Sequence, residues 1–198
     1  MELKKEMQKS AQVEHELLEV IHKRRSKRAY LNKAVEQNII DSLFEAARWA
    51  PSSNNEQPWV YIYATKDQTE LWSKIFDTLN EGNKVWAESA PLLVLSVMRK
   101  NFLRNDQPNQ SAKYDLGAAN AFLSLQATHV GLNVHQLGGF NRQMATENMA
   151  IPDTHEPVII MAIGYPGAAE SLPENLKLRE EKPNERYTKN SFVMNKTF

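Results

Sequence analysis

The sequence predicts a mixed α and β fold in which a sheet lies between layers of helices. Residues 90–98 and 157–164 are short, continuous apolar runs, which are typical of strands covered on both faces. Elsewhere, apolar residues recur every three or four positions, as they do in amphipathic helices. Strands therefore alternate with helices along the chain. With 198 residues the chain is long enough to bury a substantial core, and we expect one domain over residues 1–198.

The first half of the chain predicts two helices, a strand and a third helix. Apolar residues have helical spacing over residues 10–23 and 36–49, and Pro51 ends the second helix. Residues 59–64 are aromatic and β-branched, which is typical of a strand. Residues 67–79 predict a third helix, which the aspartate at its start is expected to cap.

The second half continues this alternation. Residues 91–98 predict a strand covered on both faces, whereas residues 99–111 are polar and predict a loop. The longest helical pattern covers residues 111–130, and its small residues allow another helix or a second subunit to approach closely. The remaining predicted elements are a strand over residues 133–137, a helix over 141–149 and a strand over 157–165.

The C-terminal segment has a different character. Residues 167–190 are mostly polar and charged, with few candidates for a core before Phe192 and Val193. Such a segment buries little apolar surface on its own chain. We expect it to be either disordered or an arm that lies across a partner.

Composition excludes several classes of function. The chain has no cysteine, which rules out disulfides, thiol nucleophiles, thiolate metal sites and iron–sulfur clusters. The five histidines lack metal-ligand spacing, so no metal is expected. A formal net charge of +0 argues against broad nucleic-acid binding. We expect a cytoplasmic protein without membrane partners, because the N-terminus is unlike a signal peptide and no apolar run could span a bilayer.

A basic segment follows the first predicted helix, where residues 24–28 read Arg-Arg-Ser-Lys-Arg. Arg24 and Arg28 are four residues apart, so a continued helical turn would place them on one face. Guanidinium groups match phosphate oxygens in a bidentate way, and Ser26 adds a neutral donor between them. The alternative is a solvated basic stretch at a helix end, where cations offset the helix dipole.

A polar segment bracketed by prolines lies about two dozen residues further on. Residues 51–59 read Pro-Ser-Ser-Asn-Asn-Glu-Gln-Pro-Trp. Ser52, Ser53, Asn55 and Gln57 could present hydroxyl and amide groups to the edge of a polar ring. The alternative is that these residues only form turns and caps at the exit of a helix.

Paired glycines at Gly138 and Gly139 follow the short strand predicted over residues 133–137. Paired glycines allow a ligand to approach backbone amides closely, although a simple turn is the alternative. The chain contains no GxGxxG, GxxxxGK[ST] or GxSxG motif, so Rossmann, P-loop and nucleophile-elbow sites are unsupported.

Taken together, these motifs are more specific than any one of them. Arg-Arg-Ser-x-Arg after an N-terminal helix, then Ala-Pro-Ser-Ser-x-Asn-x-Gln-Pro-Trp, then Gly-Gly-Phe, resemble the FMN-dependent nitroreductase family over about residues 15–165. The resemblance implies an α+β, nitroreductase-like fold with a central, mainly antiparallel sheet flanked by helices. It also implies a homodimer with FMN at the subunit interface and a C-terminal arm, about residues 167–198, that is exchanged between subunits.

The resemblance also assigns a phosphate site. Arg24 and Ser26 match the residues that hold the FMN phosphate, and Arg25 contributes nearby. Arg186 resembles the tail residue that completes this site. The sequence after Arg186 departs from the pattern of the family, which makes Lys189 the alternative.

For the flavin ring, Arg28 matches the cation near the pyrimidine end of the isoalloxazine. The other ring-side matches are Pro51, Ser52, Ser53, Asn55 and Gln57 from the second subunit, and Asn83, Gln136, Leu137, Gly138 and Gly139.

The implied activity is that of an NAD(P)H-dependent oxidoreductase. Hydride passes from NADH or NADPH to flavin N5 and then to a nitroaromatic or quinone-type acceptor, in a ping-pong mechanism. Arg28 would stabilise the reduced, anionic flavin, and no catalytic side chain is required because the flavin carries the chemistry. Two alternatives stay open. One is a dehalogenase or dehydrogenase of the same fold acting on another small aromatic or enoate, and the other is a flavin-binding protein without useful turnover.

Overall fold

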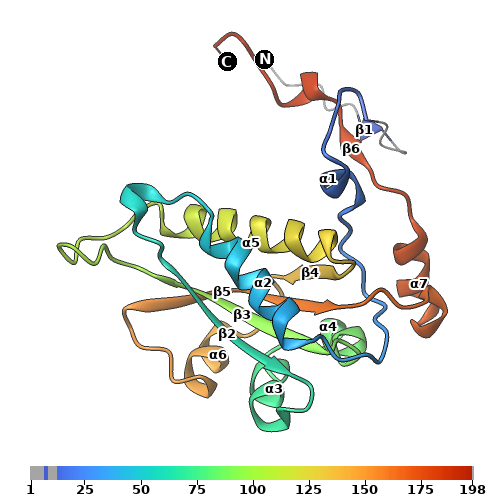
Figure 1. Ribbon diagram of the computed structural model, residues 1–198, viewed down its shortest axis with the longest axis horizontal. Coiled ribbons are helices and arrows are strands. Elements are labelled where there is room, and N and C mark those ends of the chain that lie inside the picture. The colour runs from blue at the N-terminus through green and yellow to red at the C-terminus, as the bar shows by residue number, and fades with distance from the viewer. Residues whose placement is uncertain (1–6, 9–12, 198) are drawn as a thin grey trace.

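The computed structural model describes residues 7–8 and 13–197, and its centre is an antiparallel sheet of four strands (Figure 1). The strand order is β2–β3–β5–β4, so β3 and β5 are the inner strands. The strands span Trp59–Thr65 (β2), Leu92–Arg99 (β3), Asn133–Leu137 (β4) and His155–Gly164 (β5).

Helices cover both faces of this sheet. In Figure 1, α2 and α5 lie on one side and α3, α4 and α6 on the other, which confirms the predicted sheet between helix layers. Among the described residues, none of the helices has the length and apolar character needed to cross a membrane. The helices span Glu19–Lys23 (α1), Gln37–Arg48 (α2), Thr69–Phe76 (α3), Glu81–Ala87 (α4), Ala112–His129 (α5), Arg142–Asn148 (α6) and Glu174–Glu181 (α7).

The inner strands are apolar on both sides because each face of the sheet meets its own core. Leu93 and Leu95 of β3 belong to the core that contains Trp86 of α4. Leu92 and Val94, which alternate with them, belong to the core beneath α2 and α5. The unbroken apolar run in the sequence therefore reports two buried faces, as predicted for these strands.

The helix predicted over residues 10–23 is wrong for most of its length. Residues 10–12 lie outside the described residues, residues 13–18 are not helical, and only α1, Glu19–Lys23, forms. Val13 is 47% exposed and Leu18 is 69% exposed. Helical spacing of apolar residues stabilises a helix only when a core receives the apolar face, and this chain supplies no such core here.

The helix predicted over residues 67–79 is shorter than expected and is not capped by Asp67. Gln68 precedes α3, and the Asp67 side chain hydrogen-bonds back to Thr65, which lowers the pKa of the Asp67 carboxyl. The chain then forms a second helix, α4, which the sequence analysis missed.

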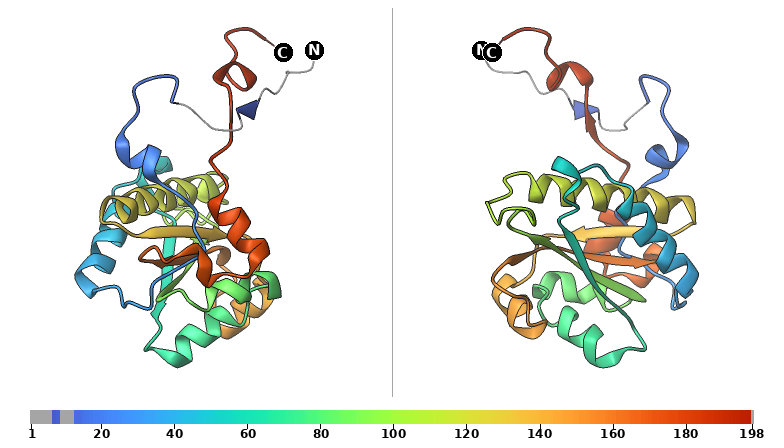
Figure 2. Two further views of the ribbon diagram at one scale, coloured as in Figure 1. Left: turned by 90° about the vertical axis from the view of Figure 1, so that its right-hand side faces the viewer. Right: turned by 60° about the vertical axis from the view of Figure 1, so that its left-hand side comes forward.

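The tail is more ordered than predicted. Leu172 and Leu176 are 9% and 8% exposed and join the core around Trp86, so α7 packs on its own chain. Beyond α7, the two-residue strand β6, Arg186–Tyr187, pairs antiparallel with β1, Met7–Gln8. Both views in Figure 2 show this last part of the tail leaving the layered body. The prediction of a coreless tail is therefore wrong as far as α7, because Leu172 and Leu176 are buried, although Leu178 of the same helix is 61% exposed.

Candidate functional site

The basic segment leaves α1 as extended chain. The helix ends at Lys23, and Arg24 has φ −58° and ψ 124°, so the predicted helical turn that joins Arg24 and Arg28 is wrong. The two side chains instead go to different places: Arg24 lines a cavity, and Arg28 packs beside Trp86 and Glu180. The physical reason is that Glu180 accepts the Arg28 backbone N–H, which a continued helix would have used internally.

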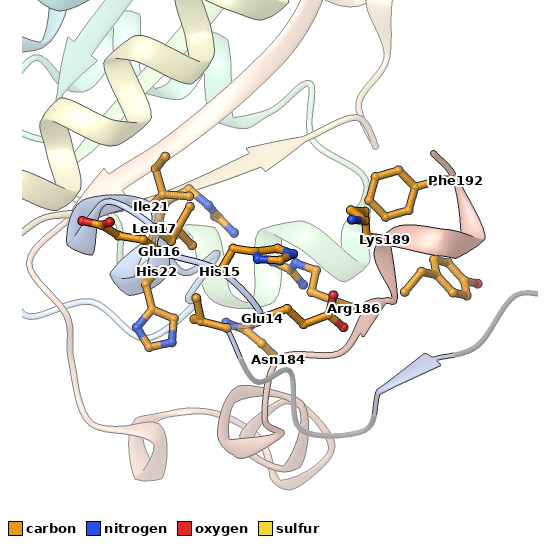
Figure 3. Close-up of a pocket in the computed structure, with 13 residues that line it drawn as sticks. Glu14, His15, Glu16, Leu17, Ile21, His22, Asn184, Arg186, Lys189 and Phe192 are labelled. Carbon is orange, nitrogen blue, oxygen red and sulfur yellow. The ribbon is translucent and has the colours of Figure 1, made fainter. Parts of the chain in front are cut away.

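The cavity has a volume of about 570 Å³ and lies between residues 13–24 on one side and residues 184–192 on the other. Arg24 and two cations of the tail, Arg186 and Lys189, line it together. Figure 3 shows Arg186 and Lys189 reaching in from the tail opposite residues 14–22. The structure therefore brings Arg24 together with both tail residues that the sequence left as alternatives.

Positive charges lie close together at Arg24. Burial, followed by repulsion from Arg186 and Arg25, lowers the pKa of the Arg24 guanidinium. Arg24 Nη1 also donates to Ser26 Oγ at 3.1 Å, whereas Arg25 Nη2 donates to the Lys182 carbonyl oxygen at 2.9 Å. An anion between Arg24 and Arg186 would offset their repulsion, and a phosphate matches the guanidinium geometry.

Two carboxylates bound the same cavity. Glu14 and Glu16 line it beside the cations, and Figure 3 shows both on the wall formed by the N-terminal segment. The cavity is therefore not uniformly basic, and its positive charge is concentrated where Arg24 and Arg186 approach each other.

Arg28 connects the basic segment to β4 through an aromatic cluster. Its guanidinium carbon lies 5.8 Å from the ring centroid of Trp86, and its Nη1 lies 3.9 Å from Glu180 Oε2. The His135 ring lies 4.6 Å from the same Trp86 ring, and His135 Nδ1 lies 3.2 Å from the Lys27 carbonyl oxygen. This carbonyl can only accept, so His135 carries its proton on Nδ1.

The end of β4 carries the two glycines predicted to face the ring. Asn83 Nδ2 donates to the Gly139 carbonyl oxygen at 3.0 Å, so these two predicted site residues are in contact. A Cβ atom at Gly139 would lie 2.8 Å from Asn83 Nδ2 and 3.1 Å from Asn80 Nδ2. At Gly138 a Cβ atom would meet nothing within 4 Å. The open backbone of this strand end is thus at Gly138, while Gly139 is covered by α4.

The side chains of Gln136 and Leu137 are engaged within the chain. Gln136 Nε2 donates to Ser124 Oγ of α5 at 3.2 Å, and Ser124 Oγ donates to the Asn120 carbonyl oxygen at 2.7 Å. Leu137 is 3% exposed and packs in the core on the other face of the sheet. These two predicted residues therefore hold the strand end in place.

The polar segment after α2 is a tight turn with an unusual backbone. Asn54, Asn55 and Gln57 have φ values of 53°, 56° and 48°, in the left-handed region that non-glycine residues rarely occupy. Ser52 Oγ accepts from the Gln57 backbone N–H at 3.0 Å. The Ser53 N–H donates to the Asp115 carboxylate at 3.1 Å, so the turn is tied to the start of α5.

Within one chain, the basic segment and this turn do not meet. Ser53 contacts Asp115, whereas Val20 of α1 lies beside Gln126 of the same helix. Asp115 and Gln126 are 11 residues apart in α5, or about 16 Å along the helix axis. Figure 1 likewise shows α1 and the turn after α2 at opposite ends of α5.

Three residues of this region were missed by the sequence analysis, namely Trp86, His135 and Glu180. Trp86 and His135 stand alone in their segments and carry no motif. Glu180 does have a signal, because Leu172, Leu176 and Glu180 recur at every fourth position, which is the spacing of one helical face.

The protein should become less stable as the pH falls, because of His135. Burial, followed by repulsion from Arg28, lowers the pKa of His135 from 6.5 to about 4. Since this pKa lies below that of the unfolded chain, the unfolded chain takes up the proton first as the pH falls. The contribution of the neutral His135 side chain to stability is fully present above about pH 6.5 and is lost as the pH falls from there toward pH 4. We expect the free energy of unfolding, measured in urea, to fall by about 2 kcal/mol between pH 7 and pH 5 from this group.

The His135→Asn variant should lose this part of the pH dependence, because its amide can still donate to the Lys27 carbonyl but does not titrate. The matched control is His129→Asn, at the exposed end of α5. An equal change of slope in the control, or none in His135→Asn, would contradict the assignment.

Comparison with known proteins places this chain in a family. The family model described as "Nitroreductase family" matches residues 21–165. A solved structure titled "The crystal structure of the oxidoreductase containing FMN" superposes with a TM-score of 0.89 at 30% identity, covering 94% of this chain and 95% of that one.

Two curated relatives each cover 76% of this chain. A protein of Archaeoglobus fulgidus named "Putative NADH dehydrogenase/NAD(P)H nitroreductase" is 28% identical over 155 residues, which cover 76% of this chain and 86% of the relative. The iodotyrosine deiodinase of Haliscomenobacter hydrossis is 22% identical over 179 residues, which cover 76% of this chain and 79% of the relative. Because the family model matches well over half of the residues, the chain belongs to the Nitroreductase family, and the predicted family, fold and oxidoreductase class are confirmed.

Proposed function

We propose that this chain is an FMN-dependent oxidoreductase that takes electrons from NADH or NADPH and reduces a nitroaromatic or quinone-type acceptor by a ping-pong mechanism. The family match and the similarity to a solved oxidoreductase containing FMN support the cofactor. The observation that carries the proposal is the convergence of Arg24, Arg186 and Lys189 on one cavity.

The residues present fit FMN. Arg24, Ser26 and Arg186 would hold the phosphate, with Lys189 beside them, because a dianion relieves the repulsion between the two guanidinium groups. The isoalloxazine would lie toward the open backbone at Gly138. When bound, FMN supplies the two-electron redox chemistry that connects the nicotinamide with the acceptor.

The side chains of this chain bind, orient and stabilise charge. Arg28 is a fixed cation, because Trp86 and Glu180 both engage its guanidinium. A cation held in this way stabilises negative charge that develops on a neighbouring ring without reorganising during the reaction. Asn83 orients the strand end at Gly139.

The complete site would need a second copy of the chain. Residues 51–57 and the basic segment lie at opposite ends of α5, so Pro51, Ser52, Ser53, Asn55 and Gln57 of a second copy would approach the cavity of the first. Large apolar side chains on α5 support such a homodimer, since Tyr114 is 82% exposed and Phe122 is 41% exposed.

The end of the tail would be the arm that covers the second copy. Phe192 and Val193 are 67% and 52% exposed on a segment that leaves the layered body. A homodimer that buries these side chains would also bring Lys189 to a subunit boundary. The exchange of this arm, the single domain and the cytoplasmic location remain predictions.

Anaerobic titration of the FMN-loaded protein tests the function. We expect NADH or NADPH to bleach the flavin absorbance, and a nitroaromatic or quinone to restore it. Protein that binds FMN but is not bleached by either nicotinamide would indicate a flavin-binding protein without turnover. Protein that cannot take up FMN would overturn the proposal.

Halogenated phenols should be tested as a second class of acceptor in the same titration. The similarity to an iodotyrosine deiodinase favours halogenated phenols as a candidate. Restoration of the flavin absorbance by a halophenol, but not by nitroaromatics or quinones, would assign a reductive dehalogenase instead.

A further inference from the structure

The basic segment and the tail lie side by side and run in opposite directions. Toward the C-terminal end of the basic segment, the Glu180 carboxylate accepts from backbone N–H groups. At its N-terminal end, Arg24 and Arg186 approach each other in the cavity. The contacts between these ends are Lys27 Nζ to the Glu180 carbonyl oxygen at 2.7 Å and Arg25 Nη2 to the Lys182 carbonyl oxygen at 2.9 Å.

Glu180 is the centre of this pairing. Its Oε1 accepts from the N–H groups of Arg28 at 2.9 Å and Ala29 at 3.2 Å, and its Oε2 lies 3.1 Å from the Arg28 nitrogen. Its Oε2 also lies 3.9 Å from the Arg28 guanidinium. Glu180 is only 4% exposed, so these contacts replace its hydration. A buried carboxylate with such partners fixes the backbone that supplies them.

The segments that the Glu180 carboxylate joins also carry several positively charged side chains. The basic segment carries four cations over residues 24–28, and the tail brings Arg186 and Lys189 to the cavity that Arg24 lines. Arg24 and Arg186 repel each other, and Glu180 is a buried negative charge at the other end of the paired segments. Leu172 and Leu176 anchor the start of the tail in the core, so the position of Glu180 is set by packing.

We infer that Glu180 is a positioning residue, which holds the basic segment against the tail so that Arg24 and Arg186 form one phosphate site. Glu180 itself does not line the cavity. This inference rests on the proposed FMN function, because it concerns the phosphate end of that cofactor. It predicts that a change at Glu180 acts on recognition of the phosphate and not on recognition of the ring.

The test compares FMN with riboflavin, which lacks the phosphate, by titrating flavin fluorescence against wild type, Glu180→Gln and the control Glu181→Gln. Glutamine keeps the shape of Glu180 but loses its charge and turns a donor toward one of the N–H groups. We expect Glu180→Gln to weaken FMN binding on the order of tenfold, the effect of losing one charge-assisted hydrogen bond. Riboflavin affinity should be unchanged, and the exposed Glu181→Gln should match wild type for both ligands.

The other outcomes are distinct. Wild-type affinities for both ligands in Glu180→Gln would overturn the inference, and so would an equal loss for both, which indicates general destabilisation. Wild-type protein that binds neither ligand would instead remove the proposed function. If Glu180→Gln does not fold, amide hydrogen exchange in the wild-type protein decides the matter. The Arg28 and Ala29 amides should exchange slowly, and rapid exchange at these two positions would refute the role of Glu180.

Discussion

Replacing Arg24 with alanine should weaken FMN binding about 100-fold, or roughly 3 kcal/mol, while riboflavin affinity stays nearly constant. The reason is that Arg24 is half-buried in the cavity and faces Arg186, so its guanidinium is desolvated before the phosphate arrives. Charge-assisted hydrogen bonds are stronger in such a site than in open water. Titration of flavin fluorescence against both ligands measures the effect.

The matched control for Arg24 is its neighbour Lys23. Lys23 is exposed and forms an ion pair with Glu19 at 2.6 Å, so Lys23→Ala removes one positive charge from the same surface without touching the cavity. We expect Lys23→Ala to change FMN affinity by less than about threefold. A similar loss in both variants would mean that general positive charge, and not the Arg24 site, attracts the phosphate.

Replacing Arg99 with alanine should lower the free energy of unfolding by about 3 kcal/mol. Arg99 Nη2 donates to Glu56 Oε2 at 2.9 Å and to the Glu56 carbonyl oxygen at 3.1 Å. The side chain of Glu56 is 8% exposed, so the substitution leaves a buried carboxylate without its cation. Because Glu56 lies inside the left-handed turn, the loss should also release residues 51–57. Urea denaturation measures the stability.

An exposed pair of the same chemistry is the control for Arg99. Arg48 contacts Glu45 with two hydrogen bonds, of 2.8 Å and 2.6 Å, at the surface of α2. We expect little change in stability for Arg48→Ala, because water replaces the lost partner. If Arg99→Ala were as stable as Arg48→Ala, the turn would not depend on the buried pair.

Much of the fold could be predicted because its signals are local. The helix α2 is amphipathic over its length, and β3 is apolar on both faces because both faces are buried. The order of the basic segment, the polar turn and the paired glycines likewise indicated the family. Each helix, strand or motif depends on residues that are close in sequence, and a periodic pattern indicates the surroundings of such residues.

The predictions that failed concern segments whose partners are distant in sequence. Residues 13–18 have helical spacing but no core to receive it in this chain. The basic segment does not continue α1 at its C-terminal end, because Glu180, more than 150 residues away, accepts the backbone N–H groups of Arg28 and Ala29. The tail was predicted to lack a core because it has few apolar residues. Two of them, Leu172 and Leu176, are nevertheless buried.

The layered architecture and the family could be predicted from the sequence alone, and the sequence also named the residues that we propose for a phosphate and a flavin ring. Which side chains meet depends on the packing of the chain: Arg24 lines one cavity with Arg186 and Lys189, Arg28 contacts Trp86 and Glu180, and Ser53 contacts Asp115. The physical reason is that the charge and hydrogen-bonding capacity of a side chain are properties of the residue. Its partners, its desolvation and its pKa depend on how the whole chain packs.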